Sequence, residues 1–197
     1  MQNKNKHINQ LLQQCKKGEQ SAQFEIYKLY YKAMYNTALR ILKDTFEAED
    51  IMQEAFLTAF SKLSTFKNQS RFGENNVPFS SWLKRIVINK SLSQLRKSKR
   101  LEQWNDEKMT SNLSVEENDT IENNYNSLKV EQILKSIKEL KDNYSTILTL
   151  SLIEGFDNEE IAKILNINNQ LVRTTISRAK AKLRSVLNKK INKYENR

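Results

Sequence analysis

The shortage of chain-breaking residues is the feature that most restricts how this chain folds. Only three glycines and one proline occur among its 197 residues. Tight turns and strand connections depend heavily on these two residue types, whereas most long segments here are rich in residues that favour helices. The sequence therefore predicts an all-α protein.

Periodic apolar residues predict where the N-terminal helices lie. A short helix at 6–17 ends at Gly18, and longer helices follow at 21–42, 47–63 and 80–99. The core-facing side of the second helix comprises Ala22, Ile26, Leu29, Ala33, Met34, Thr37 and Ile41. That of the third comprises Ala48, Ile51, Ala55, Ala59 and Leu63. The only proline lies between Phe66 and Phe79, where we expect a loop.

The composition changes sharply after Arg100. Residues 101–126 contain seven acidic residues and one lysine, a net charge of −6 in a chain whose total is +10. So polar a segment buries too little apolar surface to fold by itself. We therefore expect two small helical domains, at 1–100 and 128–197, joined by a flexible acidic linker at 101–127. Helices at 128–140 and 144–153 begin the second domain.

Residues 157–187 have the pattern of a helix-turn-helix. Asp157 and Glu160 have the spacing of a capping box, and Asn166 suits a tight turn because asparagine tolerates a left-handed backbone. The second helix, 169–187, buries Leu171, Val172, Ile176, Ala179 and Leu183. Its outer side carries the candidate DNA contacts Gln170, Arg173, Thr174, Ser177, Arg178 and Lys182.

The charge of this second helix supports the same interpretation. Eight lysines or arginines and no acidic residue occur between Arg173 and Lys193, and DNA phosphates repel carboxylates. Two amphipathic helices with a solvated basic face are the alternative. DNA binding is favoured because the cap, the turn and the one-sided charge occur together.

The helix at 80–99 is a second candidate nucleic-acid surface, with no acidic residue from Ser80 to Arg100. Its predicted contacts at helical spacing are Arg85, Asn89, Arg96 and Arg100, with Ser93 among them. Trp82 and the loop aromatics Phe66, Phe72 and Phe79 are candidates for stacking on unpaired bases. Core packing is the favoured alternative for Trp82 and even more so for Phe79, since large aromatic side chains are buried on average.

The helix at 47–63 begins with a cluster of acidic and amide residues, namely Glu47, Glu49, Asp50, Gln53 and Glu54. Acids in a first helical turn interact favourably with the helix dipole, which explains their position but not their density. On a basic protein, such a patch is a candidate docking site for a positively charged protein.

Together these motifs resemble the sigma-70 family of bacterial RNA polymerase sigma factors, in its small extracytoplasmic-function (ECF) group. The likeness covers about residues 20–100, as region 2, and 128–187, as region 4. The region 2 motifs are Glu47–Phe56, Phe79–Asn89 and Leu95-Arg96. The region 4 motifs are Glu154-Gly155-Phe156, Glu159–Ala162, Val172-Arg173-Thr174, Arg178-Ala179 and Leu183-Arg184.

The resemblance implies a role for each surface. The acidic helix would dock on the clamp of the largest polymerase subunit, with Asp50 and Gln53 the strongest matches, and the flap of the second-largest subunit would be a further contact. The helix at 80–99 would melt the minus-ten promoter element and hold its non-template strand. The helix at 169–187 would read the minus-thirty-five element. The linker would pass through polymerase channels, and an anti-sigma factor is a further candidate partner.

The sequence also bounds the class of function. One cysteine and one histidine argue against a metal site or cysteine–histidine catalysis, and no other motif indicates an enzyme or a cofactor. No apolar run reaches the roughly 20 residues of a membrane span, and without a signal-peptide pattern we expect a cytoplasmic bacterial protein. A stand-alone helix-turn-helix regulator that binds operators as a dimer is the main alternative, and an RNA-binding adaptor is a weaker one.

Overall fold

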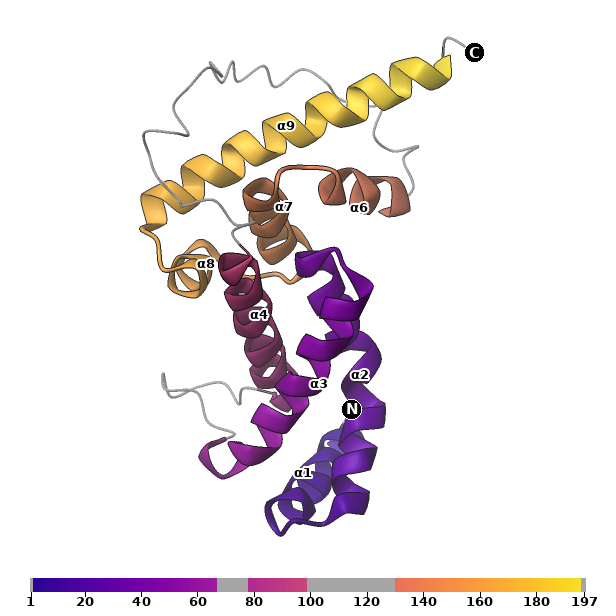
Figure 1. Cartoon of the computed structure of the whole chain (residues 1–197), viewed down its shortest axis with the longest axis vertical. Helices are drawn as coiled ribbons and strands as arrows, with labels where there is room; N and C mark the ends of the chain where they lie inside the picture. The colour runs from indigo at the N-terminus through magenta and orange to yellow at the C-terminus, as the bar shows by residue number, and fades with distance from the viewer. Residues whose placement is uncertain (1, 67–77, 99–129, 196–197) are drawn as a thin grey trace. The chain divides into compact units, whose positions relative to one another are not determined.

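The computed structural model describes residues 2–66, 78–98 and 130–195. Every regular element in these ranges is helical, which confirms the predicted all-α class. The chain divides into two compact units, residues 1–97 and 98–197 (Figure 1). The predicted linker at 101–127 and most of the predicted loop at 66–79 lie outside the described residues.

The described residues of the first unit form four α-helices (Figure 1). These are α1 (Gln2–Lys16), α2 (Gln20–Leu42), α3 (Thr45–Ser61) and α4 (Phe79–Lys97), with a 3-10 turn, η1 (Leu63–Thr65), after α3. Helix α2 packs against α1, α3 and α4, and α3 also packs against α4. Helices α3 and α4 are therefore both packed against α2, which fixes their outer faces relative to each other.

The breaks between these helices follow local backbone chemistry. Gly18 takes a φ of 85° after α1, a conformation that costs glycine little. Lys43 adopts the left-handed conformation after α2, and its N–H donates to the Leu39 carbonyl. Asp44 then caps α3 by accepting a hydrogen bond from the Glu47 N–H at 2.9 Å. This cap therefore defines where α3, and with it its acidic face, begins.

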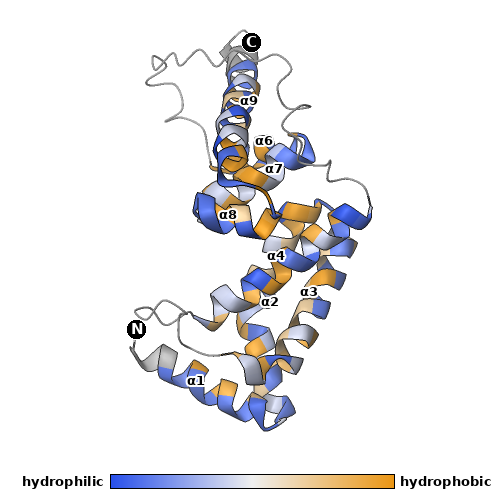
Figure 2. Cartoon of the chain, turned by 90° about the vertical axis from the view of Figure 1, so that its left-hand side faces the viewer, coloured by the Kyte–Doolittle hydropathy of each residue, from blue (hydrophilic) through white to orange (hydrophobic). Residues whose placement is uncertain are grey.

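The core of the first unit matches most of the predicted apolar stripes (Figure 2). All five predicted core residues of the third helix are buried. On α2 the prediction was wrong for Leu29, which is 49% exposed, and for Ala33, which is also exposed. Both lie at the edge of the buried stripe, where the 3.6-residue period turns side chains away from the neighbouring helices.

The second unit is also helical (Figure 1). It contains α6 (Val130–Lys138), α7 (Asp142–Leu148), a π-helical turn η3 (Thr149–Ile153), α8 (Asn158–Leu165) and α9 (Asn169–Glu195). Helices α6, α7 and α8 all pack against α9. Gly155 ends the turn after η3 with a φ of 76°. Helix α9 continues past Leu187, where the sequence suggested its end.

Candidate docking and nucleic-acid surfaces

The outermost line of α3 combines apolar and polar side chains. Asp50 and Gln53 are exposed, and they lie between Phe46, 80% exposed, and Leu57, 71% exposed. These four positions follow a spacing of four, three and four residues, so they form one stripe opposite the buried face. We call them the α3 stripe. Exposed large apolar residues gathered beside carboxylates are typical of a protein interaction site.

The remaining predicted docking residues flank the α3 stripe. Glu49 is exposed on one side, and its carboxylate accepts a hydrogen bond from the Gln53 amide at 3.5 Å. On the other side, the Lys90 Nζ lies 3.0 Å from the Glu54 carboxylate. The Gln94 amide donates to Glu47 at 3.2 Å. Glu47 and Glu54 therefore face α4.

The sequence reasoning missed the two ends of the α3 stripe. The docking prediction was based on the acidic and amide residues alone and did not include Phe46 and Leu57. Their spacing relative to Asp50 and Gln53 was visible in the sequence, because residues four, seven and eleven positions apart share a helical face. That spacing identifies the apolar part of the α3 stripe.

Helix α4 presents its predicted contacts on one side. Arg85, Asn89, Ser93 and Arg96 are all exposed. Arg100, the last residue of the predicted set, lies outside the described residues. The exposed set combines two cations with an amide and a hydroxyl, which suits phosphates and base edges respectively.

An aromatic cluster supports the start of α4. The Trp82 ring centroid lies 5.0 Å from that of Phe66 and 5.7 Å from that of Phe79. Phe66 is 7% exposed and Phe79 is 3% exposed, which confirms the core packing favoured for Phe79 and makes the stacking prediction wrong for Phe66. They are core residues because they pack against each other and, through Phe79, against Tyr30. Burial raises the pKa of Tyr30.

Trp82 is half-buried, whereas Phe66 and Phe79 are buried. Packing therefore accounts for one part of the side chain and leaves another accessible. Phe72, the remaining aromatic residue of the predicted loop, lies outside the described residues.

The helix-turn-helix has the predicted local geometry. The Glu160 N–H donates to the Asp157 carboxylate at 2.8 Å, and the Asp157 N–H donates to the Glu160 carboxylate at 3.3 Å. This reciprocal arrangement is the predicted capping box. Asn166 adopts the predicted left-handed conformation, with a φ of 57°. Asn168, which the sequence reasoning did not single out, caps α9 by accepting from the Leu171 N–H at 2.6 Å.

The buried side of α9 is as predicted, with all five expected residues buried. Of the candidate contacts, Gln170, Arg173, Ser177 and Lys182 are exposed. Thr174 and Arg178 are half-buried, and the Thr174 hydroxyl donates to the Gln170 carbonyl at 3.0 Å. The candidate contacts are thus spread over the outer half of the helix.

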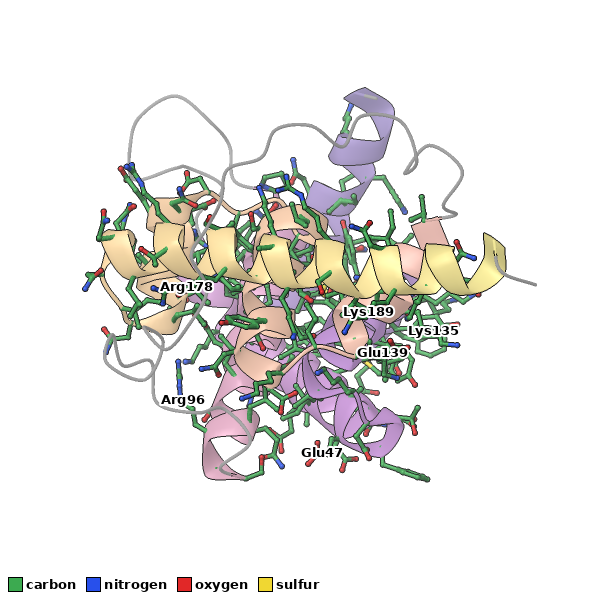
Figure 3. The ribbon with its side chains drawn as sticks, turned by 90° about the horizontal axis from the view of Figure 1, so that it is seen from above. Glu47, Arg96, Lys135, Glu139, Arg178 and Lys189 are labelled. Carbon is green, nitrogen blue, oxygen red and sulfur yellow. The ribbon has the colours of Figure 1, made fainter. Side chains whose placement is uncertain are left out.

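Charge is not uniform across this outer half. The centre carries the small or uncharged residues Gln170, Thr174, Ser177 and Ala181, at spacings of four, three and four. Cations follow the two edges, with Arg173, Lys180 and Arg184 on one and Arg178, Lys182 and Lys189 on the other. Figure 3 shows Arg178 and Lys189 on the same side of the α9 ribbon. An uncharged centre between cationic edges fits a groove floor between two phosphate backbones.

The C-terminal half of α9 is held by α6. The Lys190 Nζ lies 2.6 Å from the Glu139 carboxylate and 3.1 Å from the Ser136 hydroxyl. Glu139 projects beneath this part of α9 (Figure 3). Lys190 is thus a structural contact, whereas the neighbouring Lys189 is exposed.

The ranges that the structure covers bear on metal binding and on membrane insertion. Within them, no three His, Cys, Asp or Glu side chains gather closely enough to hold a metal ion. None of the described helices combines the length and apolar character of a membrane span. Cys15 is buried, and desolvation raises the pKa of its thiol.

Comparisons with known proteins match both units. The family model for Sigma-70 region 2 matches residues 26–101, and that for Sigma-70, region 4 matches residues 130–183. The ECF RNA polymerase sigma factor SigW of Bacillus subtilis is 33% identical over 187 residues, covering 91% of this chain and 96% of SigW. The ECF RNA polymerase sigma-E factor of Escherichia coli is 27% identical, covering 86% and 88%.

A solved structure supports the fold assignment. It contains the sigma factor RpoE in complex with the anti-sigma factor NepR from Bartonella quintana, and the match has a TM-score of 0.54 at 24% identity. The aligned region covers 83% of this chain and 95% of that chain. CnrH, solved in complex with the cytosolic domain of CnrY, matches with a TM-score of 0.51 at 22% identity. That alignment covers 90% of this chain and 95% of CnrH.

Proposed function

The chain belongs to the sigma-70 family of RNA polymerase sigma factors, in its ECF group, and we propose that its three exposed surfaces make three different contacts during transcription initiation. It is a transcription-initiation factor and not an enzyme. It binds core RNA polymerase and directs it to promoters. The observation that supports three separate contacts is that one chain has an acidic and apolar stripe on α3 and two basic helices, α4 and α9.

The α3 stripe is the proposed docking surface for the clamp of the largest polymerase subunit. Asp50 and Gln53 form its polar centre, with Phe46 and Leu57 at its ends and Glu47, Glu49 and Glu54 beside it. A basic partner would be drawn to the carboxylates during approach. The apolar ends would then supply most of the binding energy, because they have the most surface left to bury. The flap of the second-largest subunit is the proposed partner of the second unit.

Helix α4 is the proposed reader of the minus-ten element. Arg85 and Arg96 would bind phosphates of the non-template strand, and Asn89 would contact a base or the backbone. Trp82 would contribute the open part of its ring to an unstacked base, and Arg100 would extend the basic surface. Opening the duplex costs a few kcal/mol, and single-strand contacts of this kind offset that cost.

Helix α9 is the proposed reader of the minus-thirty-five element. Gln170, Thr174 and Ser177 would face base edges from the uncharged centre. Arg173 is placed near the start of the helix, where side chains normally meet bases. Arg178, Lys182 and the other cations of the two edges, apart from Arg173, would contact phosphates.

The domain boundaries and the regulation of the chain complete the proposal. We propose that 1–100 and 128–197 act as separate domains and that 101–127 connects them within the polymerase. The proposed location is the cytoplasm of a bacterium, where RNA polymerase works. An anti-sigma factor is a further proposed partner, since RpoE and CnrH were solved with protein partners.

Transcription with purified core polymerase on a promoter library tests this function. With the chain present, transcripts should arise from a subset of templates that share two separated sequence elements. A stand-alone regulator would instead bind palindromic sites as a dimer and leave core polymerase without new start sites. Absence of chain-dependent transcripts, with a known sigma factor active in parallel, would favour that alternative.

A further inference from the structure

Two side chains of α4 reach across to carboxylates of α3. The Lys90 Nζ lies 3.0 Å from a Glu54 oxygen, and the Gln94 amide lies 3.2 Å from a Glu47 oxygen. Lys90 and Gln94 are one turn apart on α4, and their partners are two turns apart on α3. The flank of the proposed docking surface is thus tied directly to the helix proposed to bind DNA.

Lys90 is oriented differently from the cations of the α4 DNA face. It follows Asn89 in the chain, which turns it by about 100° around the helix axis. The Lys90 side chain is 28% exposed and that of Glu54 is 60% exposed. The ammonium therefore neutralises a docking carboxylate in the free chain. A lysine side chain is long and flexible, so the same ammonium has the reach to turn toward a phosphate once the carboxylate is engaged elsewhere.

We propose that the Glu54–Lys90 pair couples polymerase docking to binding of the melted promoter strand. In the free chain, Glu54 and Lys90 form an ion pair with each other. Docking sets Glu54 against a basic partner, which competes with Lys90 and releases its ammonium for a phosphate of the melted strand. This inference rests on the proposed docking role of α3, and it assigns to one ion pair of this chain a part in linking docking to DNA binding.

The size of the coupling is bounded by the strength of the ion pair. Exposed pairs rarely contribute enough to change an equilibrium constant by more than about fivefold. Coupling between two binding events is reciprocal, so the factor by which docking strengthens strand binding equals the factor by which the strand strengthens docking. The effect should shrink with added salt, because mobile ions screen exposed charges.

The first arm of the test measures the dissociation constant of the full chain from core polymerase at two salt concentrations. Lys90→Gln should tighten docking by about two- to fivefold at low salt, because Glu54 is released to the partner. Lys97→Gln is the matched control, with the same change of charge on the same helix at an exposed position. It should leave docking unchanged. In a Glu54→Gln background, the effect of Lys90→Gln should disappear, as a double-mutant cycle requires for a direct interaction.

The second arm measures binding of a single-stranded minus-ten oligonucleotide to the complex with core polymerase. There Lys90→Gln should weaken binding by a factor of similar size, while Lys97→Gln gives a smaller loss. Circular dichroism and melting temperature should show that each variant keeps its fold.

The outcomes separate the coupling from the docking proposal. If Asp50→Lys weakens docking while Lys90→Gln leaves it unchanged or weaker, α3 is the docking helix and the coupling is wrong. If Asp50→Lys has no effect, the docking role of α3 is wrong, and the coupling falls with it. If Lys90→Gln and Lys97→Gln both tighten docking equally, the effect comes from the change in net charge, and the coupling is also wrong.

Discussion

The two ends of the α3 stripe give the clearest quantitative prediction. Phe46 is 80% exposed and Leu57 is 71% exposed, so most of each side chain remains to be buried in a complex. Full burial of such a side chain contributes about 1.5 to 3 kcal/mol. Alanine keeps its β-carbon and about a quarter of the surface was already covered, so we expect each truncation to cost roughly 1 to 2 kcal/mol of docking energy. That corresponds to about 5- to 30-fold weaker binding to core polymerase.

The same exposure means that the free chain should lose no stability. Neither side chain is part of the core, and alanine favours the helix more than phenylalanine or leucine. The assay is an equilibrium titration of core polymerase against labelled full-length chain, with melting temperatures measured in parallel. Leu29→Ala is the matched control, because it removes a partly exposed leucine from α2, outside the α3 stripe.

Kinetics separate the apolar ends from the charged centre. Phe46→Ala and Leu57→Ala should mainly raise the dissociation rate, whereas loss of an exposed carboxylate beside them should lower the association rate in a salt-dependent way. Dissociation constants within twofold of the parent for both alanine variants would remove the α3 stripe from the interface.

Three further predictions concern the other surfaces. Arg173→Ala should relax base preference at one position of the upstream element at a cost of about 1 to 3 kcal/mol, whereas Lys182→Ala should weaken binding to all sequences and lower its salt dependence. Uniform weakening by both variants, measured on a panel of upstream sequences, would make Arg173 a phosphate contact. Asn89→Ala should slow open-complex formation on duplex promoters and act much less on a pre-melted bubble, where unpairing is already complete; equal defects on both would indicate a packing role. Asp157→Ala should cost the second unit about 1 kcal/mol and lower its melting temperature by roughly 4 to 8 °C, and an unchanged melting curve would show that the capping box adds nothing.

Features set by local chemistry were predictable from the sequence. The capping box of Asp157 and Glu160 and the left-handed turn at Asn166 depend on residues within one helical turn, and both occur as expected. The buried stripes of α3 and α9 follow from apolar spacing alone.

Features set by packing between helices were not predictable. The loop position of Phe66 suggested a ring open to unpaired bases, but this ring packs against Phe79 and Trp82. The pairing of Glu54 with Lys90 joins residues 36 positions apart, so no local pattern indicates it. Helix α9 passes its expected end, and Lys190 there binds Glu139, which directly follows α6. Such contacts depend on the register between elements, which periodicity within one element does not determine.

The central claim is that one chain contacts a single promoter at two separate elements, through α4 and α9. The most direct test tethers a DNA-cleaving iron chelate to Ser93→Cys or Ser177→Cys, two exposed positions on these helices, in a Cys15→Ala background. Each variant is then assembled with core polymerase on one promoter. We predict cleavage of the non-template strand around the minus-ten element from position 93, and cleavage within the minus-thirty-five element from position 177. Cleavage of the same element from both positions, or polymerase-dependent transcription with no cleavage from either, would contradict the claim.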